Sequence, residues 1–193
     1  MFKDRRTAMI GTLVLALFLL SLTLTNPGKA LAISAFLKID GVEGEAQDAK
    51  HKGEIEVISW SFGETHPGMG TRGGAGSAGK VNMQDFKFTM RTNKASPTLF
   101  LRGADGKVLP KTVLSVRRTS DKNQEDFLKI TLSNSLVSSF VSMGASGTTD
   151  AYPIEEILLN FSQIKISYRP MKADGTYDPF IETGWDVKSM EKR

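Results

Sequence analysis

The sequence predicts a mainly β domain, a barrel or a sandwich, with one short α-helix and an extended glycine-rich loop. From residue 33 onward apolar and polar residues mostly alternate, which is the period of a strand with one buried face. Turn residues divide these runs into about seven or eight strands, a number typical of a barrel or sandwich. One short segment carries helix-start and helix-stop residues instead.

The first half of this domain contains three of the expected strands. Residues 34–39 form a short strand that ends at an Asp-Gly turn at 40–41. Residues 54–62 begin with strict alternation and become apolar on both sides near Trp60, which indicates cover on both faces there. Residues 81–90 alternate again, so we expect a third strand with one buried face.

The second half supplies the remaining strands, separated by polar turns. They are expected at residues 112–117, 126–132, 136–141 and the long run 157–168, with a last strand that includes Trp185 and Val187. The pair Glu155-Glu156 opens the long run. Because adjacent strand residues face opposite sides, these two carboxylates cannot act jointly on one substrate bond.

One helix is expected between the two halves. Ser96 is an N-cap residue directly before Pro97 at the first helical position. Gly103 can supply the left-handed C-cap. We expect the apolar side chains between these signals to pack on the barrel: Leu99, Phe100 and Leu101.

The stretch between residues 62 and 81 is a long loop rich in glycine. Seven of the 17 residues from 63 to 79 are glycine, and no apolar residue there is larger than Met69. A loop of this length inside a compact domain is uncommon and usually functional or disordered. Glycine also weakens any tendency to fold independently. We therefore expect this loop either to bind a partner or to remain free.

Composition excludes several classes of protein. The chain has no cysteine, hence no disulfide, thiolate metal site or cysteine nucleophile. Its only histidines are His51 and His66, so we expect neither a metal nor a cofactor. Of the formal charge of +4, residues 1–32 carry +3 and the rest of the chain +1. The domain therefore lacks the concentrated basic charge of a nucleic-acid binder.

Residues 74–80 spell G-x-x-x-x-G-K, the spacing of a phosphate-binding loop. However, Val81 stands where that motif needs serine or threonine for magnesium, and a strand pattern follows where a helix is required. We do not expect nucleotide binding. His66 follows Glu64 by two residues, but two ligands do not make a metal site.

Catalytic residues are also missing. No G-x-S-x-G, H-E-x-x-H or S-x-x-K motif occurs in the chain. His51 is expected to be a solvated loop residue or one hydrogen-bonded to a nearby strand. The pair Arg117-Arg118 precedes acidic residues, which predicts a solvated surface of mixed charge: Asp121, Glu125 and Asp126. We therefore expect no enzyme.

Residues 1–32 read as a signal peptide or N-terminal apolar leader that precedes the domain at 33–193. Basic residues near the start are followed by an apolar run at 9–24, and Ala30 and Ala32 form an A-x-A cleavage pattern. The alternative is an uncleaved anchor, because about 20 apolar residues suffice to span a bilayer. The cleavage pattern favours removal and a secreted, extracellular protein.

The domain also resembles a known family. Residues 36–45 (FLKIDGVEGE) are similar to the opening of the Hcp proteins, the haemolysin-coregulated tube proteins of type VI secretion. The likeness continues in the family order over essentially all of 33–193, at 51–57, 59–61, the glycine-rich loop, 79–86, 94–97, 137–139, 158–161 and 184–186. The joint occurrence of these blocks is specific.

The resemblance implies a mainly β fold, an Hcp-like β-barrel of two sheets with one short flanking α-helix and an extended Gly-rich loop. It further implies that such barrels form homohexameric rings that stack into a hollow tube, which is expelled when a surrounding sheath contracts and can carry small effectors. The implied partners are the chain itself and sheath, spike and effector proteins, with no nucleic acid and a membrane only through an uncleaved leader. Ser61 is the implied lumen-facing residue. The implied assembly loop contacts neighbouring subunits through Gly63, Glu64, Thr65, His66, Pro67, Gly68, Met69, Gly70, Gly73, Gly74, Gly76, Gly79 and Lys80.

The leader departs from the family pattern, because Hcp proteins assemble in the cytoplasm without a signal peptide. Two explanations remain. The chain is an independently secreted or membrane-anchored barrel that serves as a binding module outside a contractile tube. Alternatively, translation starts near Leu31, which stands in the place of the usual first methionine, and assembly is cytoplasmic. A leader with all its parts in order favours the first explanation.

Overall fold

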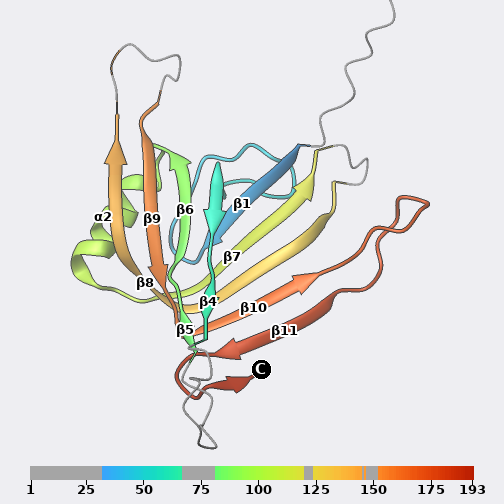
Figure 1. Ribbon diagram of the computed structural model, residues 1–193. Coiled ribbons are helices and arrows are strands. Elements are labelled where there is room, and N and C mark those ends of the chain that lie inside the picture. Colours follow the sequence, from blue (N-terminus) through green and yellow to red (C-terminus); the bar gives the residue numbers. More distant parts are fainter. Residues whose placement is uncertain (1–31, 67–80, 120–123, 145, 147–151) are drawn as a thin grey trace, which may run out of the picture. The chain divides into compact units, whose positions relative to one another are not determined.

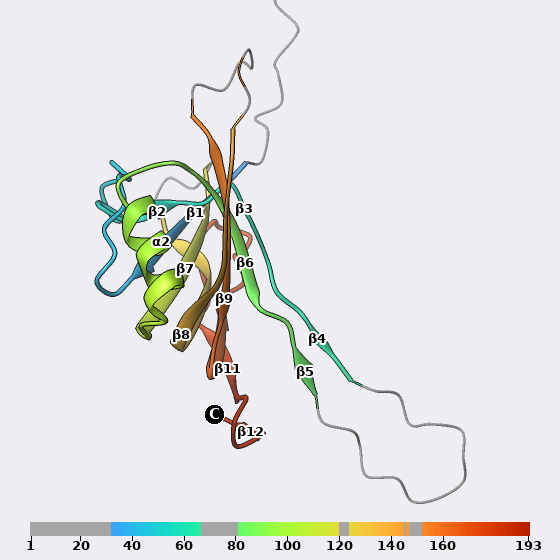
Figure 2. The ribbon, with the colours of Figure 1, turned by 90° about the vertical axis from the view of Figure 1, so that its left-hand side faces the viewer.

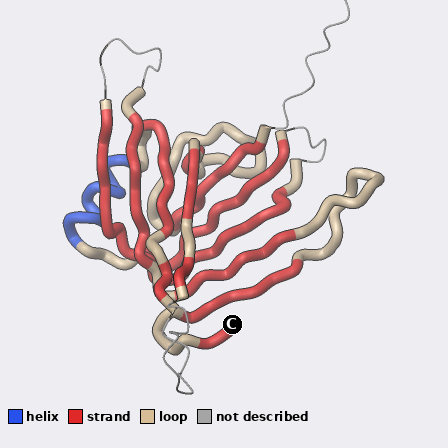
Figure 3. Tube along the Cα trace, in the orientation of Figure 1, coloured by secondary structure: helices blue, strands red, loops and turns tan. Residues whose placement is uncertain are grey.

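Strands dominate the part of the chain that the computed structural model describes, residues 32–66, 81–119, 124–144, 146 and 152–193 (Figure 1). These residues belong to one unit, Ala32–Arg193. One helix lies beside the described strands, α2 (Ser96–Asp105) (Figure 3). The predicted mainly β fold with one short helix is confirmed. The strands are β1 (Ile33–Ile39), β2 (Ile55–Glu56), β3 (Ser59–Ser61), β4 (Glu64–Thr65), β5 (Asn82–Met83), β6 (Phe86–Arg91), β7 (Leu109–Arg118), β8 (Asp126–Met143), β9 (Ile154–Asn160), β10 (Gln163–Tyr168), β11 (Ile181–Asp186) and β12 (Glu191–Lys192).

Ten of the described strands form two sheets that share β8, and the other two, β4 and β5, pair with each other. One sheet has the order β12-β11-β10-β8-β7-β1-β2, and the other runs β8-β9-β6-β3, with every pairing antiparallel. The first half of β8 lies between β7 and β10, whereas its second half pairs with β9. The 18 residues of β8 thus turn the corner between the sheets.

A left-handed residue and a bulge lie where β8 turns this corner. Asn134 has a positive φ of 50°, and the register with β9 shifts between Val137 and Ser139. Such a bulge bends a strand and increases its twist. The strands predicted at 126–132 and 136–141 are therefore one bent strand. Conversely, the predicted run 157–168 is two strands, β9 and β10, which pair with different halves of β8.

Residues 57 and 58 join the two sheets on the opposite side. The Val57 amide donates a hydrogen bond to Ala35 in one sheet (2.9 Å), and the Ile58 amide donates to Thr89 in the other (2.9 Å). Within two residues the chain thus changes its pairing partner from β1 in one sheet to β6 in the other, and this joins the two sheets into a barrel. This crossing explains why the strand predicted at 54–62 is split into β2 and β3.

The core lies between the two sheets, and period-two alternation selects it. In β6 the side chains of Phe86, Phe88 and Met90 are fully buried, while the residues between them face outward. Glu155 and Glu156 alternate in the same way, as predicted. Glu155 is buried and accepts hydrogen bonds from α2 and from the end of β6, whereas Glu156 pairs with Lys87 at 3.2 Å.

The position of helix α2 was predicted correctly, but its caps were not. Its N-cap is Ala95, and its left-handed C-cap is Gly106 (φ 64°), whose amide donates to Arg102. Gly103 is inside the helix instead, where an added Cβ would lie 3.3 Å from Cγ1 of Val137. Of the three side chains predicted to pack, only one is buried: Leu99 is covered, whereas Phe100 is 62% and Leu101 53% exposed.

No helix in the described ranges is long and apolar enough to cross a membrane. Nearly all of the predicted leader, including Ala30, lies outside these ranges.

Candidate assembly site

A β-hairpin carries the start of the predicted assembly loop away from the barrel (Figure 2). Strands β4 and β5 pair Glu64 with Met83 and Thr65 with Asn82. The structure describes Gly63, Glu64, Thr65 and His66, of which the last three are exposed. The rest of the predicted loop lies outside the described residues: Pro67, Gly68, Met69, Gly70, Gly73, Gly74, Gly76, Gly79 and Lys80.

An apolar groove of about 450 Å³ separates the root of this hairpin from the sheet extension formed by β10 and β11. Large apolar side chains from both walls line it: Phe62, Met83, Ile164, Ile166 and Trp185. Beyond the groove, Tyr168 and Ile181 remain 42% and 68% exposed. Exposed apolar surface of this kind is typical of a contact with another protein.

The four-stranded sheet β8-β9-β6-β3 has two edges that are unpaired among the described residues. The second half of β8, residues 136–143, pairs only with β9, and β3 pairs only with β6. Neither edge has a charged side chain, since their sequences are LVSSFVSM and SWS. Proteins usually protect such edges with charges or proline, because their free N–H and C=O groups pair readily with another chain.

The predicted lumen-facing residue, Ser61, is exposed at the end of the β3 edge. It pairs with Lys87, so both lie on the sheet face that points away from the core. That same face carries Glu156 and Thr89 on the neighbouring strands.

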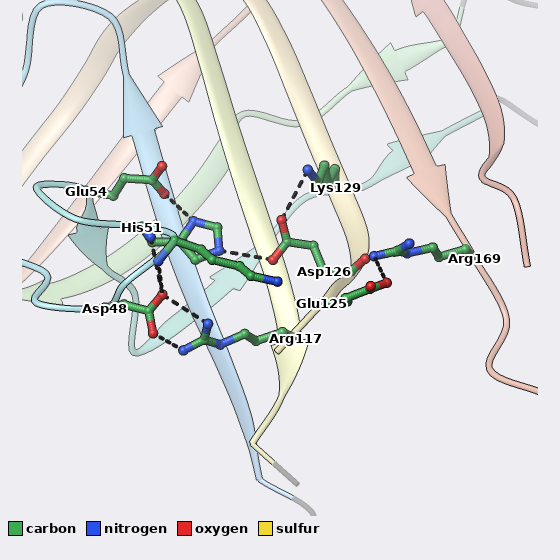
Figure 4. A network of polar contacts seen from close by, with 9 residues as sticks. Asp48, His51, Glu54, Arg117, Glu125, Asp126, Lys129 and Arg169 are labelled. Carbon is green, nitrogen blue, oxygen red and sulfur yellow. Dashed lines mark hydrogen bonds and ion pairs between the residues drawn. The ribbon is translucent and has the colours of Figure 1, made fainter. Parts of the chain in front are cut away.

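His51 belongs to a buried polar network outside these surfaces (Figure 4). It is only 5% exposed and stacks on Phe36 at 4.5 Å. Its Nδ1 lies 2.9 Å from Glu54, and its Nε2 lies 3.0 Å from Asp126 at the start of β8. The alternative of a histidine hydrogen-bonded to a nearby strand is therefore confirmed.

The prediction of a solvated surface at Arg117 is wrong. Arg117 is 8% exposed, forms a two-pronged ion pair with Asp48, and places its guanidinium 5.1 Å from the Phe36 ring centre. The loop between β1 and β2 folds over the outer face of the sheet and covers this pair. The neighbouring Arg118 lies over Phe127 at 4.4 Å.

The network stabilises the charged forms of His51, Asp126 and Asp48. Hydrogen bonds to Asp126 and Glu54 raise the pKa of His51 to about 9, against a smaller opposing effect of burial. Burial by itself would raise the pKa of Asp126, but hydrogen bonds from His51 and Lys129 bring it below the ordinary value. Burial and Arg117 oppose each other in the same way at Asp48, and its pKa is also lowered. The network is therefore a set of paired charges that holds the loop between β1 and β2 against strands β7 and β8.

This pKa shift predicts a loss of stability in alkali. A histidine with a raised pKa stabilises the fold fully below its unfolded value near 6.5, and the contribution disappears as pH rises through about 9. We expect the free energy of unfolding to fall by about 1–2 kcal/mol between those limits, because water at the loop screens part of the interaction. Urea denaturation of the wild type and His51→Asn at both pH values measures it. Parallel pH profiles for the two proteins would contradict the assignment.

No cluster of three or more histidine, cysteine, aspartate or glutamate side chains suitable for a metal occurs in the described residues. The G-x-x-x-x-G-K segment lies outside them, but strand β5 follows it, so the helix that a phosphate loop requires is not at this place.

Comparison with known proteins gives one consistent family. The family described as "Type VI secretion system effector, Hcp" matches residues 36–168. Protein hcp1 of Pseudomonas aeruginosa is 42% identical over 159 residues, which cover 82% of this chain and 97% of that protein. The crystal structure of Hcp1 from Salmonella typhimurium is 33% identical with a TM-score of 0.69, over 84% of this chain and 100% of the other. A structure described as a type six secretion system protein gives a TM-score of 0.78 at 27% identity, with the same coverage of both chains.

Proposed function

Because the chain belongs to the Hcp family of type VI secretion system proteins, we propose that it is a structural subunit of the inner tube of such a system. Proteins of this family are structural rather than enzymatic, and they are secreted through type VI systems. In the proposal, the barrel at 33–193 forms homohexameric rings that stack, are expelled on sheath contraction, and carry small effectors in the lumen.

The observation that carries this proposal is the pair of uncharged edges on one sheet. The edge at 136–143 and the β3 edge lie on opposite sides of the same four strands, so each can pair with the other edge of a second copy. Such a contact is heterologous: it uses two different patches and closes into a ring when the rotation is right. The exposed face with Ser61 would then line the ring.

Stacking of the rings is assigned to the hairpin and its loop, residues 63–80. The hairpin strands β4 and β5 lead the chain away from the barrel (Figure 2), and most of their residues are exposed. The apolar groove beside the hairpin offers surface for a neighbouring subunit. Sheath, spike and effector proteins are the remaining partners in this proposal.

A second candidate is an independently secreted or membrane-anchored barrel that acts outside a contractile tube. The leader at 1–32 favours it, because tube subunits that assemble in the cytoplasm need no signal peptide. In both candidates the chain divides into residues 1–32 and the barrel at 33–193.

The native mass of purified 33–193, followed by negative-stain imaging, separates the two candidates. A hexameric species with ring views is the expected result. A stable monomer at high concentration would contradict the tube proposal and favour the second candidate.

Removing residues 68–79 tests the role of the loop. The shortened protein is expected to keep the far-ultraviolet spectrum and melting temperature of the barrel, because the described core residues all come from other parts of the chain. Its rings should form shorter stacks in sedimentation and imaging. If the shortened subunit unfolds, the loop is part of the barrel and its assignment to stacking is wrong.

A further inference from the structure

One carboxylate ties the root of the β4–β5 hairpin to two neighbouring strands. Asp85 lies between β5 and β6, on the sheet face that points away from the core. Its Oδ2 accepts a hydrogen bond from Ser138 Oγ in β8 at 2.5 Å, and its Oδ1 accepts one from Asn160 Nδ2 at the end of β9 at 2.8 Å. The next residue toward the hairpin, Gln84, donates its amide to Gly63 at 2.9 Å and so begins the hairpin ladder.

The contact depends on the bulge in β8. Ser138 is the extra residue there, since Val137 pairs with Leu159 and Ser139 pairs with Leu158. A bulge re-aims the side chain of its extra residue, and here the hydroxyl reaches both Asp85 and the Leu158 carbonyl oxygen (3.2 Å). One feature thus bends β8 and provides a donor at the hairpin root.

We propose that Asp85 is a positioning residue that fixes the direction in which the β4–β5 hairpin leaves the barrel. Hydrogen bonds to a charged acceptor are the stronger class, and Asp85 accepts two of them from separate strands. Without them, the root of the hairpin is held to the barrel by the β3–β6 pairing and by the packing of Phe62 and Met83 against the core. This inference rests on the proposed function only in giving the hairpin a role in stacking.

Hydrogen–deuterium exchange with peptide resolution tests the positioning directly. In Asp85→Ala, exchange in peptides that cover 62–66 and 81–85 is expected to rise about tenfold, while peptides from β7 and the first half of β8 stay unchanged. The measurement is made at a protein concentration where native mass spectrometry shows one oligomeric state for all variants, so that disassembly cannot account for the change. A double variant that swaps the two residue types, Asp85→Asn with Asn160→Asp, restores an amide–carboxylate pair and should recover most of the protection from exchange.

Ser59→Ala is the matched control. It removes the hydrogen bond between the Ser59 and Thr89 hydroxyls (2.7 Å) on the same sheet face, and should leave hairpin exchange unchanged. The inference is overturned if the hairpin peptides of Asp85→Ala exchange as slowly as those of the wild type. It is also overturned if exchange rises equally over the whole barrel.

Ring and stack formation by the same variants distinguishes this inference from the proposed function. Faster hairpin exchange together with shorter stacks supports both. Faster exchange with normal stacking supports the positioning role of Asp85 and removes the hairpin from the stacking contact. Unchanged exchange overturns the inference whether or not rings form.

Discussion

Asp48→Ala is expected to lower the free energy of unfolding of the barrel by about 3 kcal/mol, a large part of the stability of a domain of this size. The substitution leaves the Arg117 guanidinium buried without its carboxylate. It also removes the acceptor of the His51 and Lys50 amides, which shapes the loop over the sheet. Urea denaturation at neutral pH measures the change.

Two further variants separate the unpaired charge from the loss of a contact. Glu43→Ala breaks an ion pair with Lys94 that has a good distance, 2.7 Å, but lies at the surface with the Glu43 side chain 75% exposed. Its expected cost is below about 1 kcal/mol. Adding Arg117→Met to Asp48→Ala should recover much of the lost stability, because no buried ion then lacks a partner. An Asp48→Ala cost no larger than that of Glu43→Ala would contradict the structural role of the pair.

The alternation in β6 shows which parts of the fold can be predicted from sequence. Each buried residue there is two positions from the next, and the pattern alone selects Phe86, Phe88 and Met90. Arg117 has no such signal. Its partner Asp48 lies 69 residues earlier in a loop, and the loop covers the outer face of a sheet that alternation alone marks as solvated.

For helix α2 the prediction was wrong in the opposite sense, because side chains expected to be buried are exposed. Its apolar side chains were expected to pack, but Phe100 and Leu101 are mostly exposed. Buried residues are mostly apolar, but apolar residues are often exposed, so residue type does not fix which side of a short helix faces the core. The helix also continues past Gly103, whose missing side chain lets it approach Val137, and ends at a glycine that has the required positive φ.

Of the candidate assembly site, the sequence marks only the glycine-rich loop, whose role stays a prediction. Glycine content marked residues 63–80, but the edges of the four-stranded sheet could not be recognised in advance. Residues 126–132 and 136–141 are both predicted as strands, yet only the first half of β8 gains a partner on both sides. Which half stays open depends on the corner at Asn134, and therefore on pairings far away in the chain.

Val141→Lys is expected to abolish ring formation while leaving the subunit folded. Val141 is 43% exposed at the middle of the β8 edge, and lysine on an edge strand opposes pairing with another chain. A closed ring contains this contact at every subunit, so the penalty recurs at each interface. Native mass spectrometry should show monomers at concentrations where we expect the wild type to form hexamers, with little change in melting temperature.

Thr89→Lys is a closely matched control for that result. Val141 and Thr89 are both partners of Glu156 in β9, on the same face of the sheet, so each new lysine meets the same opposite charge. The difference between them is that β8 is an edge at this point, whereas β6 lies between β9 and β3. Loss of rings in both variants would mean that charge on the face is responsible. Loss in neither would mean that the rings form through the apolar groove. Pairing of the two edges is supported only if Val141→Lys loses its rings and Thr89→Lys keeps them. That contact uses the free backbone groups of β8, and β6 has no equivalent free groups.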